Sequence, residues 1–238
     1  VLASSDPNDG KPLISTSVTE VIMATDAAGN LYFVTQLISS IFEYALYKIS
    51  PDGTLERLPW GGASRGGYGD YPWGLAIGAD GKIFHTAPTL DDVIFLNEGT
   101  DTSIYAGTLW SNHGVDGAGA NASFSDISGL TYADGRLLVS DNYSNNIVHL
   151  SGGASVRAVS PTGEVTTLYT GPSHESPSER SLHIAALASA DIALATFRTA
   201  MDLSRIAPDG SASPLPKGDF QEFVAMASDA TDRLLVAE

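Results

Sequence analysis

Short apolar stretches alternate with turns rich in Asp, Gly and Asn along the whole chain. In the first clear copy, two β-rich stretches at 21–25 and 31–34 flank a turn at 26–30, which is the pattern of a β-hairpin. The same unit recurs four times, the last two in weaker form: 74–77 with 83–84, 129–132 with 137–139, 183–187 with 192–195, and 223–227 with 234–236. No segment sustains the apolar spacing of a packed helix. The pattern therefore predicts an all-β chain.

A second hairpin unit follows the first and is marked by a Pro-x-Gly turn. Its clearest copy is 47–55, around Pro51 and Gly53; it recurs at 157–165 and 204–210, with a degenerate copy at 94–99. Pro and Gly at these offsets satisfy the dihedral angles of tight turns. We therefore interpret these residues as turn formers rather than ligand-binding residues.

Two hairpins per repeat, with a period of about 40 to 50 residues, are typical of a β-propeller. We predict a single domain over 1–238 with about five four-stranded blades. The last repeat lacks its second hairpin, and 1–14 resembles an isolated copy of it. We expect this N-terminal hairpin to complete the last blade, so that no sheet edge is left unpaired. A sixth blade is the alternative if part of the natural chain is missing.

Charge and cysteine content narrow the possible partners. Asp and Glu total 28 against 12 Lys and Arg, a formal charge of −16. Such a surface disfavours nucleic acid and anionic membranes, and suits cations or neutral ligands. The absence of cysteine excludes disulfides and thiolate chemistry, and no apolar run approaches the roughly 20 residues of a membrane span. Because the chain begins at Val1 without Met, we expect a processed, secreted protein.

One repeat carries a more specific motif. Residues 114–124 read GVDGAGANASF, followed by Gly129-Leu130, a strand ending in Asp141, and Asn145-Asn146-Ile147. This resembles the NHL repeat. The resemblance implies kinship with NHL propellers and with the senescence-marker/gluconolactonase and strictosidine-synthase-like groups, which usually have six blades. These groups include protein-binding and RNA-binding modules, calcium-dependent lactonases, a zinc and calcium lyase, and cyclising enzymes, and in the lactonases Glu, Asn and Asp hold calcium at the axis.

The loops that lead into each blade, and those joining its second and third strands, share one face, where propeller ligands usually sit. Carboxylates prevail there, and hard cations such as Ca²⁺ prefer carboxylate oxygens. We predict a calcium site drawn from five residues of separate blades: Glu20, Asp70, Asp126, Asp141 and Glu222. The alternative is that each carboxylate is solvated or caps a turn.

The same face carries candidates for acid-base chemistry and for ligand contacts. His183, which begins an inner strand, is the best candidate for acid-base work, and a hydrogen-bonded structural histidine is the alternative. Five residues are candidates for binding a small molecule, glycan or protein: Tyr68, Tyr71, Trp73, Arg198 and Asn142. For the aromatic residues, wedging between blades is the alternative.

Two functions stay open from the sequence. The absence of a complete catalytic constellation favours a secreted ligand- or protein-binding propeller without catalysis, and the acidic face favours a calcium-dependent hydrolase of the lactonase or esterase type. Whether the protein is an enzyme is therefore left undecided by the residues alone.

Overall fold

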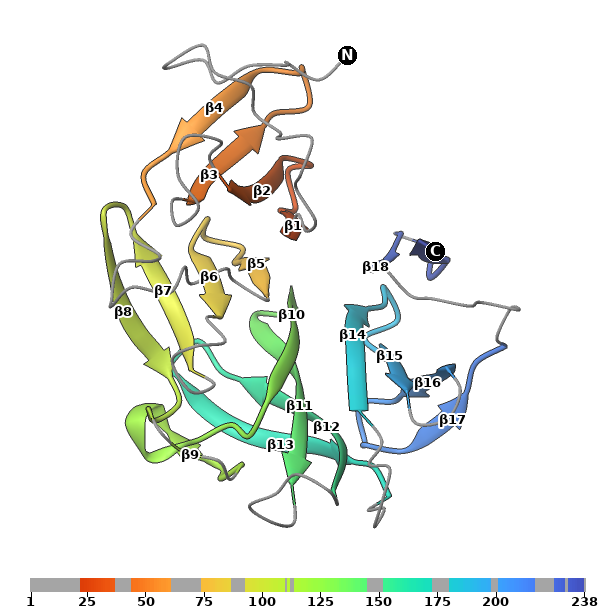
Figure 1. Cartoon of the computed structure of the whole chain (residues 1–238). Helices are drawn as coiled ribbons and strands as arrows, with labels where there is room; N and C mark the ends of the chain where they lie inside the picture. The colour runs from red at the N-terminus through yellow and green to blue at the C-terminus, as the bar shows by residue number, and fades with distance from the viewer. Residues whose placement is uncertain are drawn as a thin grey trace.

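The computed structural model describes residues 22–36, 44–60, 74–86, 93–109, 111, 114–144, 152–172, 180–197, 201–216, 225–229 and 231–237. These residues form five small antiparallel sheets arranged around a common axis, which confirms the predicted propeller of about five blades (Figure 1). The described residues contain a single short 3₁₀ helix, Gly119–Asn121. None of the described helical structure is long and apolar enough to cross a membrane.

Each blade begins with its innermost strand and continues outward. Blade 1 contains β1 (Ile22–Thr25), β2 (Leu31–Gln36), β3 (Tyr44–Ile49) and β4 (Leu55–Leu58). Blade 2 contains β5 (Leu75–Ile77), β6 (Ile83–Thr86), β7 (Ile94–Glu98) and β8 (Asp101–Ala106). Blade 4 contains β14 (Arg180–Ala186), β15 (Ile192–Phe197), β16 (Met201–Ile206) and β17 (Ala212–Pro214).

Blades 3 and 5 depart from the four-strand pattern. Blade 3 contains β10 (Ile127–Ala133), β11 (Arg136–Ser144), β12 (Gly152–Val159) and β13 (Glu164–Thr170), and the short β9 (Gly117–Ala118) pairs outside β13 as a fifth strand. The described part of blade 5 is one hairpin, β18 (Ala225–Ser228) and β19 (Leu234–Ala237). The predicted closing hairpin at 1–14 lies outside the described residues, so ring closure stays a prediction.

The turns between strands have the geometry that their residues predicted. Gly53 has a φ of 86°, which favours glycine, and its N–H donates to the carbonyl of Ser50 at 2.8 Å. The N–H of Thr54 donates to the carboxylate of Asp52 at 2.9 Å. In the first hairpin the Asp26 carboxylate accepts from the backbone N–H groups of Ala28 and Asn30. These Asp and Gly residues therefore shape turns, as expected.

Four of the five hydrophobic clusters among the described residues lie between two blades, and the fifth lies within blade 1. One cluster joins Phe84 and Ile94 of blade 2 to Leu137 and Val139 of blade 3. Further clusters join blades 1 and 2, blades 3 and 4, and blades 4 and 5. The inner strands also contact one another in chain order, from β1 through β5, β10 and β14 to β18. Each blade is therefore stabilised by its neighbours, because one face of a sheet is buried against the next.

Two glycines allow the inner strands to approach closely. A Cβ atom on Gly74, just before β5, would lie 2.8 Å from the Cβ of Leu130 on β10. A Cβ atom on Gly129 would lie 2.8 Å from the Ser140 hydroxyl and 3.1 Å from a methyl of Ile184 on β14. Both glycines belong to the repeated Gly-Leu pairs of the sequence. Their lack of a side chain sets the spacing between neighbouring blades near the axis.

A buried histidine lies between blades 1 and 2. The His85 ring is 4.6 Å from the Trp60 ring and 5.3 Å from the Phe95 ring, centroid to centroid. Its Nδ1 atom and the indole N–H of Trp60 are both buried without a hydrogen-bond partner among the described residues. Burial lowers the pKa of His85 to about 4, so the native imidazole is neutral at neutral pH.

This histidine predicts a loss of stability in acid. As the pH falls below 6.5 the unfolded chain binds a proton at His85, whereas the native protein resists protonation until about pH 4. Stability therefore falls by about 2 kcal/mol between pH 7.5 and 5 through this group alone, and is unaffected by it at higher pH. Urea unfolding of the wild type and of His85→Phe at both pH values measures the difference. If the free energy of unfolding fell equally in the two proteins between these pH values, this account would be contradicted.

Candidate functional site

A cavity of about 600 Å³ lies on the axis of the propeller. It is lined by the innermost strands of all five blades, together with residues of β2 and β19. Its volume is within the range of small-molecule sites, roughly 300 to 1,000 Å³. The lining residues are Met23, Ala24, Thr25, Leu31, Leu75, Ala76, Ile77, Leu130, Thr131, Tyr132, Ile184, Ala185, Ala186, Met226, Ala227, Ser228, Leu235 and Val236.

The cavity lies toward one end of the axis. Its lining includes the last three residues of β1, β14 and β18, and each of these strands leads directly into the first hairpin turn of its blade. The loops that lead into the blades are at the other end of the inner strands. The cavity formed by the described residues therefore lies toward the mouth opposite the face on which the sequence predicted the site.

The polar side chains of the described lining carry hydroxyl groups. The described lining contains no Asp, Glu, Lys, Arg or His, and its polar side chains are Thr25, Thr131, Tyr132 and Ser228. Each inner strand is also the edge of its sheet, hydrogen-bonded to one neighbouring strand. Backbone N–H and C=O groups on the other edge of these strands therefore point toward the axis, where they can bind a ligand.

Most residues of the predicted site fall outside the part of the chain that the structure describes. They are Glu20, Tyr68, Asp70, Tyr71, Trp73, Arg198 and Glu222. The described candidates are Asp126, Asp141, Asn142 and His183. Within the described residues, no three His, Asp or Glu side chains come close enough to hold a metal ion together. The calcium site stays a prediction.

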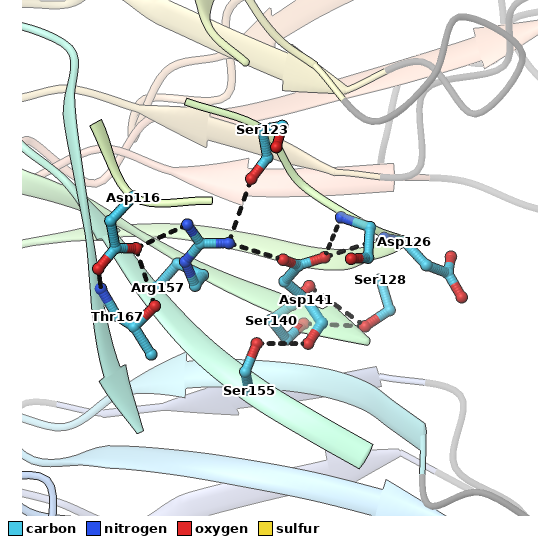
Figure 2. A network of polar contacts seen from close by, with 10 residues as sticks. Asp116, Ser123, Asp126, Ser128, Ser140, Asp141, Ser155, Arg157 and Thr167 are labelled. Carbon is cyan, nitrogen blue, oxygen red and sulfur yellow. Dashed lines mark hydrogen bonds and ion pairs between the residues drawn. The ribbon is translucent and has the colours of Figure 1, made fainter. Parts of the chain in front are cut away.

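The structure places Asp141 in a buried ion pair (Figure 2). Its Oδ2 lies 3.0 Å from Arg157 Nη1, and both side chains are almost fully buried. Its Oδ1 accepts from the backbone N–H groups of Ser125 and Asp126, each at 2.9 Å. Burial raises the pKa of the Asp141 carboxyl. The hydrogen bonds from Ser125, Asp126 and Arg157 lower that pKa, but burial has the larger effect. Both carboxylate oxygens are thus engaged within blade 3. Asp126 belongs to the same blade, so the expectation that the five carboxylates come from separate blades is wrong for this pair.

Arg157 extends this network to the motif around Asp116. Its Nη2 donates to Asp116 Oδ1 at 2.7 Å, and the other Asp116 oxygen accepts from the N–H of Thr167 at 2.9 Å (Figure 2). Burial alone would raise the pKa of Asp116, but the bonds from Thr167 and Arg157 outweigh it and lower that pKa. The guanidinium carbon also lies 5.3 Å from the centre of the Phe124 ring. The network holds the motif segment against blade 3.

Arg157 was not among the residues that the sequence predicted for this site. Arg157 pairs with Val139 on β11, so it lies diagonally across from Asp141, on the same face of the sheet. Asp116 and Phe124 are both part of the NHL-like motif. One feature of the sequence could have indicated the network: a single Arg stands within an apolar strand, in the stretch Val156-Arg157-Ala158. A cation buried in such a strand requires a partner of opposite charge.

The remaining described candidates lie in or next to the first two strands of blades 3 and 4, and His183 lies within β14 rather than at its beginning, where the sequence predicted it. Asp126 directly precedes β10, and its carbonyl accepts from the N–H of Asn142 at 2.9 Å, so the pairing of β10 with β11 brings these two residues together. Asn142 is buried. His183 is half-buried on β14, next to a register shift in the pairing with β15. Their predicted roles in ligand binding and acid-base chemistry stay predictions.

Solved structures share this fold. Virginiamycin B lyase from Staphylococcus aureus aligns with a TM-score of 0.55 and 16% identity, over 90% of this chain and 61% of that one. A gluconolactonase from Xanthomonas campestris aligns with a TM-score of 0.59 and 11% identity, over 90% of this chain and 68% of that one. No protein-family model and no curated protein sequence matches the chain.

These comparisons concern the fold. The chain spans about three-fifths of the length of the lyase. The predicted likeness to gluconolactonase-like propellers is confirmed at the level of architecture, whereas the NHL repeat itself stays a prediction.

The buried ion pair predicts the effect of removing one charge. Asp141→Asn removes the buried one of the two carboxylates that pair with Arg157 and leaves only the half-exposed Asp116, so it should reduce the free energy of unfolding by up to about 3 to 5 kcal/mol. The matched control is Asp80→Asn, which removes an exposed ion pair with Lys82 and should change stability by less than about 1 kcal/mol. Urea unfolding measures both. Similar small effects from the two substitutions would contradict the structural role of Asp141.

Proposed function

We propose that this propeller binds a small organic molecule in its axial cavity. The observation that carries the proposal is the cavity of about 600 Å³ lined by the inner strands of all five described blades. Concave sites with mostly apolar walls and a few polar groups are where proteins hold small molecules. Because the walls belong to strands rather than loops, the site is largely formed before the ligand arrives, and binding costs little ordering entropy.

A ligand screen with two matched variants tests this function. Ala227 is an exposed residue of β18 that lines the cavity, and Ala212 is an exposed residue of the outer strand β17. A compound present at 100 times its Kd should stabilise the wild type by about 2.7 kcal/mol, which raises its Tm by several degrees. Ala227→Phe should abolish this shift by filling the cavity, and Ala212→Phe should keep it. Compounds that stabilise all three proteins equally would contradict the axial site.

A second candidate is metal-dependent hydrolysis of a lactone or ester at the opposite mouth of the axis. Its support is an analogy of fold with the Xanthomonas gluconolactonase, together with the position of Asp126 at the beginning of β10. Since both oxygens of Asp141 are engaged by Ser125, Asp126 and Arg157, Asp126 is the described carboxylate that best fits a calcium ligand. Calcium bound there would polarise the substrate carbonyl.

The metal hypothesis predicts a response to calcium. After treatment with a chelator, millimolar Ca²⁺ should raise the Tm of the wild type, because an ion that binds only the folded state stabilises it. Asp126→Asn should weaken that shift, and hydrolysis of a lactone or aryl ester should depend on the added metal. An unchanged Tm and no metal-dependent turnover would exclude this candidate. Action outside the cytoplasm, and glycan or protein partners at the predicted face, stay predictions.

A further inference from the structure

The described walls of the axial cavity carry no ionised side chain in a strongly acidic protein. The formal charge of the chain is −16, yet the described lining contains no carboxylate, ammonium, guanidinium or imidazole group. A ligand ion placed there would lose hydration without gaining a counter-charge.

Exposed apolar side chains gather at the same cavity. Large hydrophobic side chains are rarely exposed in the described structure, and two of the most exposed, Met23 and Leu235, both line the cavity. These residues are 58% and 60% exposed. An exposed apolar surface in a concave site marks a place where a ligand can be buried. The flexible thioether of Met23 adapts to ligands of different shape.

The cavity also offers hydrogen bonds, but from neutral groups. The axial edges of β1, β5, β10, β14 and β18 present backbone donors and acceptors toward the axis, and Thr25, Thr131 and Tyr132 add hydroxyl groups. These groups would stay unpaired beneath a purely hydrocarbon ligand, which costs free energy when they are buried. A ligand with hydroxyl or carbonyl groups avoids that cost.

We propose that the axial cavity takes an uncharged molecule with a largely apolar frame that carries neutral hydrogen-bonding groups such as N–H, hydroxyl or carbonyl. This inference rests on the proposed function and adds the class of ligand. It concerns the mouth where the first hairpin turns lie, so it does not depend on the candidate calcium site at the other mouth. It predicts that, between two compounds of the same skeleton, the neutral one binds and the ionised one is rejected.

Two fluorescent probes test the charge preference directly. N-phenyl-1-naphthylamine is neutral, and 8-anilinonaphthalene-1-sulfonate has the same rings with an added sulfonate. Titrations in 0.5 M NaCl, where the Debye length is about 4 Å, suppress repulsion between the sulfonate and the acidic surface. The neutral probe should bind the wild type at least tenfold more tightly than the sulfonate. Ala227→Phe should abolish its binding, and Ala212→Phe should not.

A charge placed in the cavity should invert the preference. Ala227→Lys supplies the missing counter-charge, so the sulfonate should bind this variant at least tenfold more tightly than it binds the wild type. Ala212→Lys adds the same charge on the outer strand and should leave both affinities unchanged. Melting curves establish whether each variant is folded. If Ala227→Phe does not fold, the comparison of Ala227→Lys with Ala212→Lys decides the question.

The outcomes separate this inference from the proposed function. If both probes bind equally and Ala227→Phe removes both, the cavity is a binding site but the neutral class is wrong. If the neutral probe does not bind, or its binding survives Ala227→Phe, the inference is overturned while compounds from the screen still support the site. If the neutral probe fails and the screen yields no compound sensitive to Ala227→Phe, the proposed function fails as well.

Discussion

The spacing between neighbouring inner strands is the constraint on which the rest of this structure depends. A Cβ atom on Gly74 would lie 2.8 Å from Leu130 of the next blade, and a Cβ atom on Gly129 would lie 3.1 Å from Ile184 of the next blade. This approach brings the faces of adjacent sheets together, so that apolar side chains such as Phe84 and Leu137 are buried between blades. It also holds the five inner strands around one axis. The three residues that follow each of these two glycines, on β5 and β10, line the cavity.

The buried ion pair of Asp141 and Arg157 serves the same architecture. The Asp141 carboxylate accepts the backbone N–H groups of Ser125 and Asp126, and Arg157 reaches across to Asp116. The segment from Gly114 to Asp126 is thereby fixed against blade 3, and it leads directly into β10. Burying these charges is costly unless every partner is present, so the network favours one arrangement of this segment over others. A carboxylate that the sequence suggested for metal binding is thus positioned to hold a blade together.

Local features of this fold were predictable from the sequence, and distant pairings were not. The hairpins and their turns followed from residues such as Asp52 and Gly53, because turn geometry depends on a few adjacent residues. The partner of Asp141 depends on the register between β11 and β12, and the packing of His85 against Trp60 depends on how two blades meet. The location of the cavity required the ends of all five inner strands to be placed together. Patterns within single repeats do not contain that information.

The central claim is that a neutral ligand occupies the axis between the inner strands. Nuclear magnetic resonance of isoleucine methyl groups tests this most directly, because Ile77 and Ile184 line the cavity, whereas Ile94 and Ile206 are fully buried on β7 and β16. On addition of N-phenyl-1-naphthylamine, the account predicts shifts of the Ile77 and Ile184 resonances and little change at Ile94 and Ile206. Shifts confined to Ile94 and Ile206, or unchanged resonances at Ile77 and Ile184 under saturating probe, would contradict it.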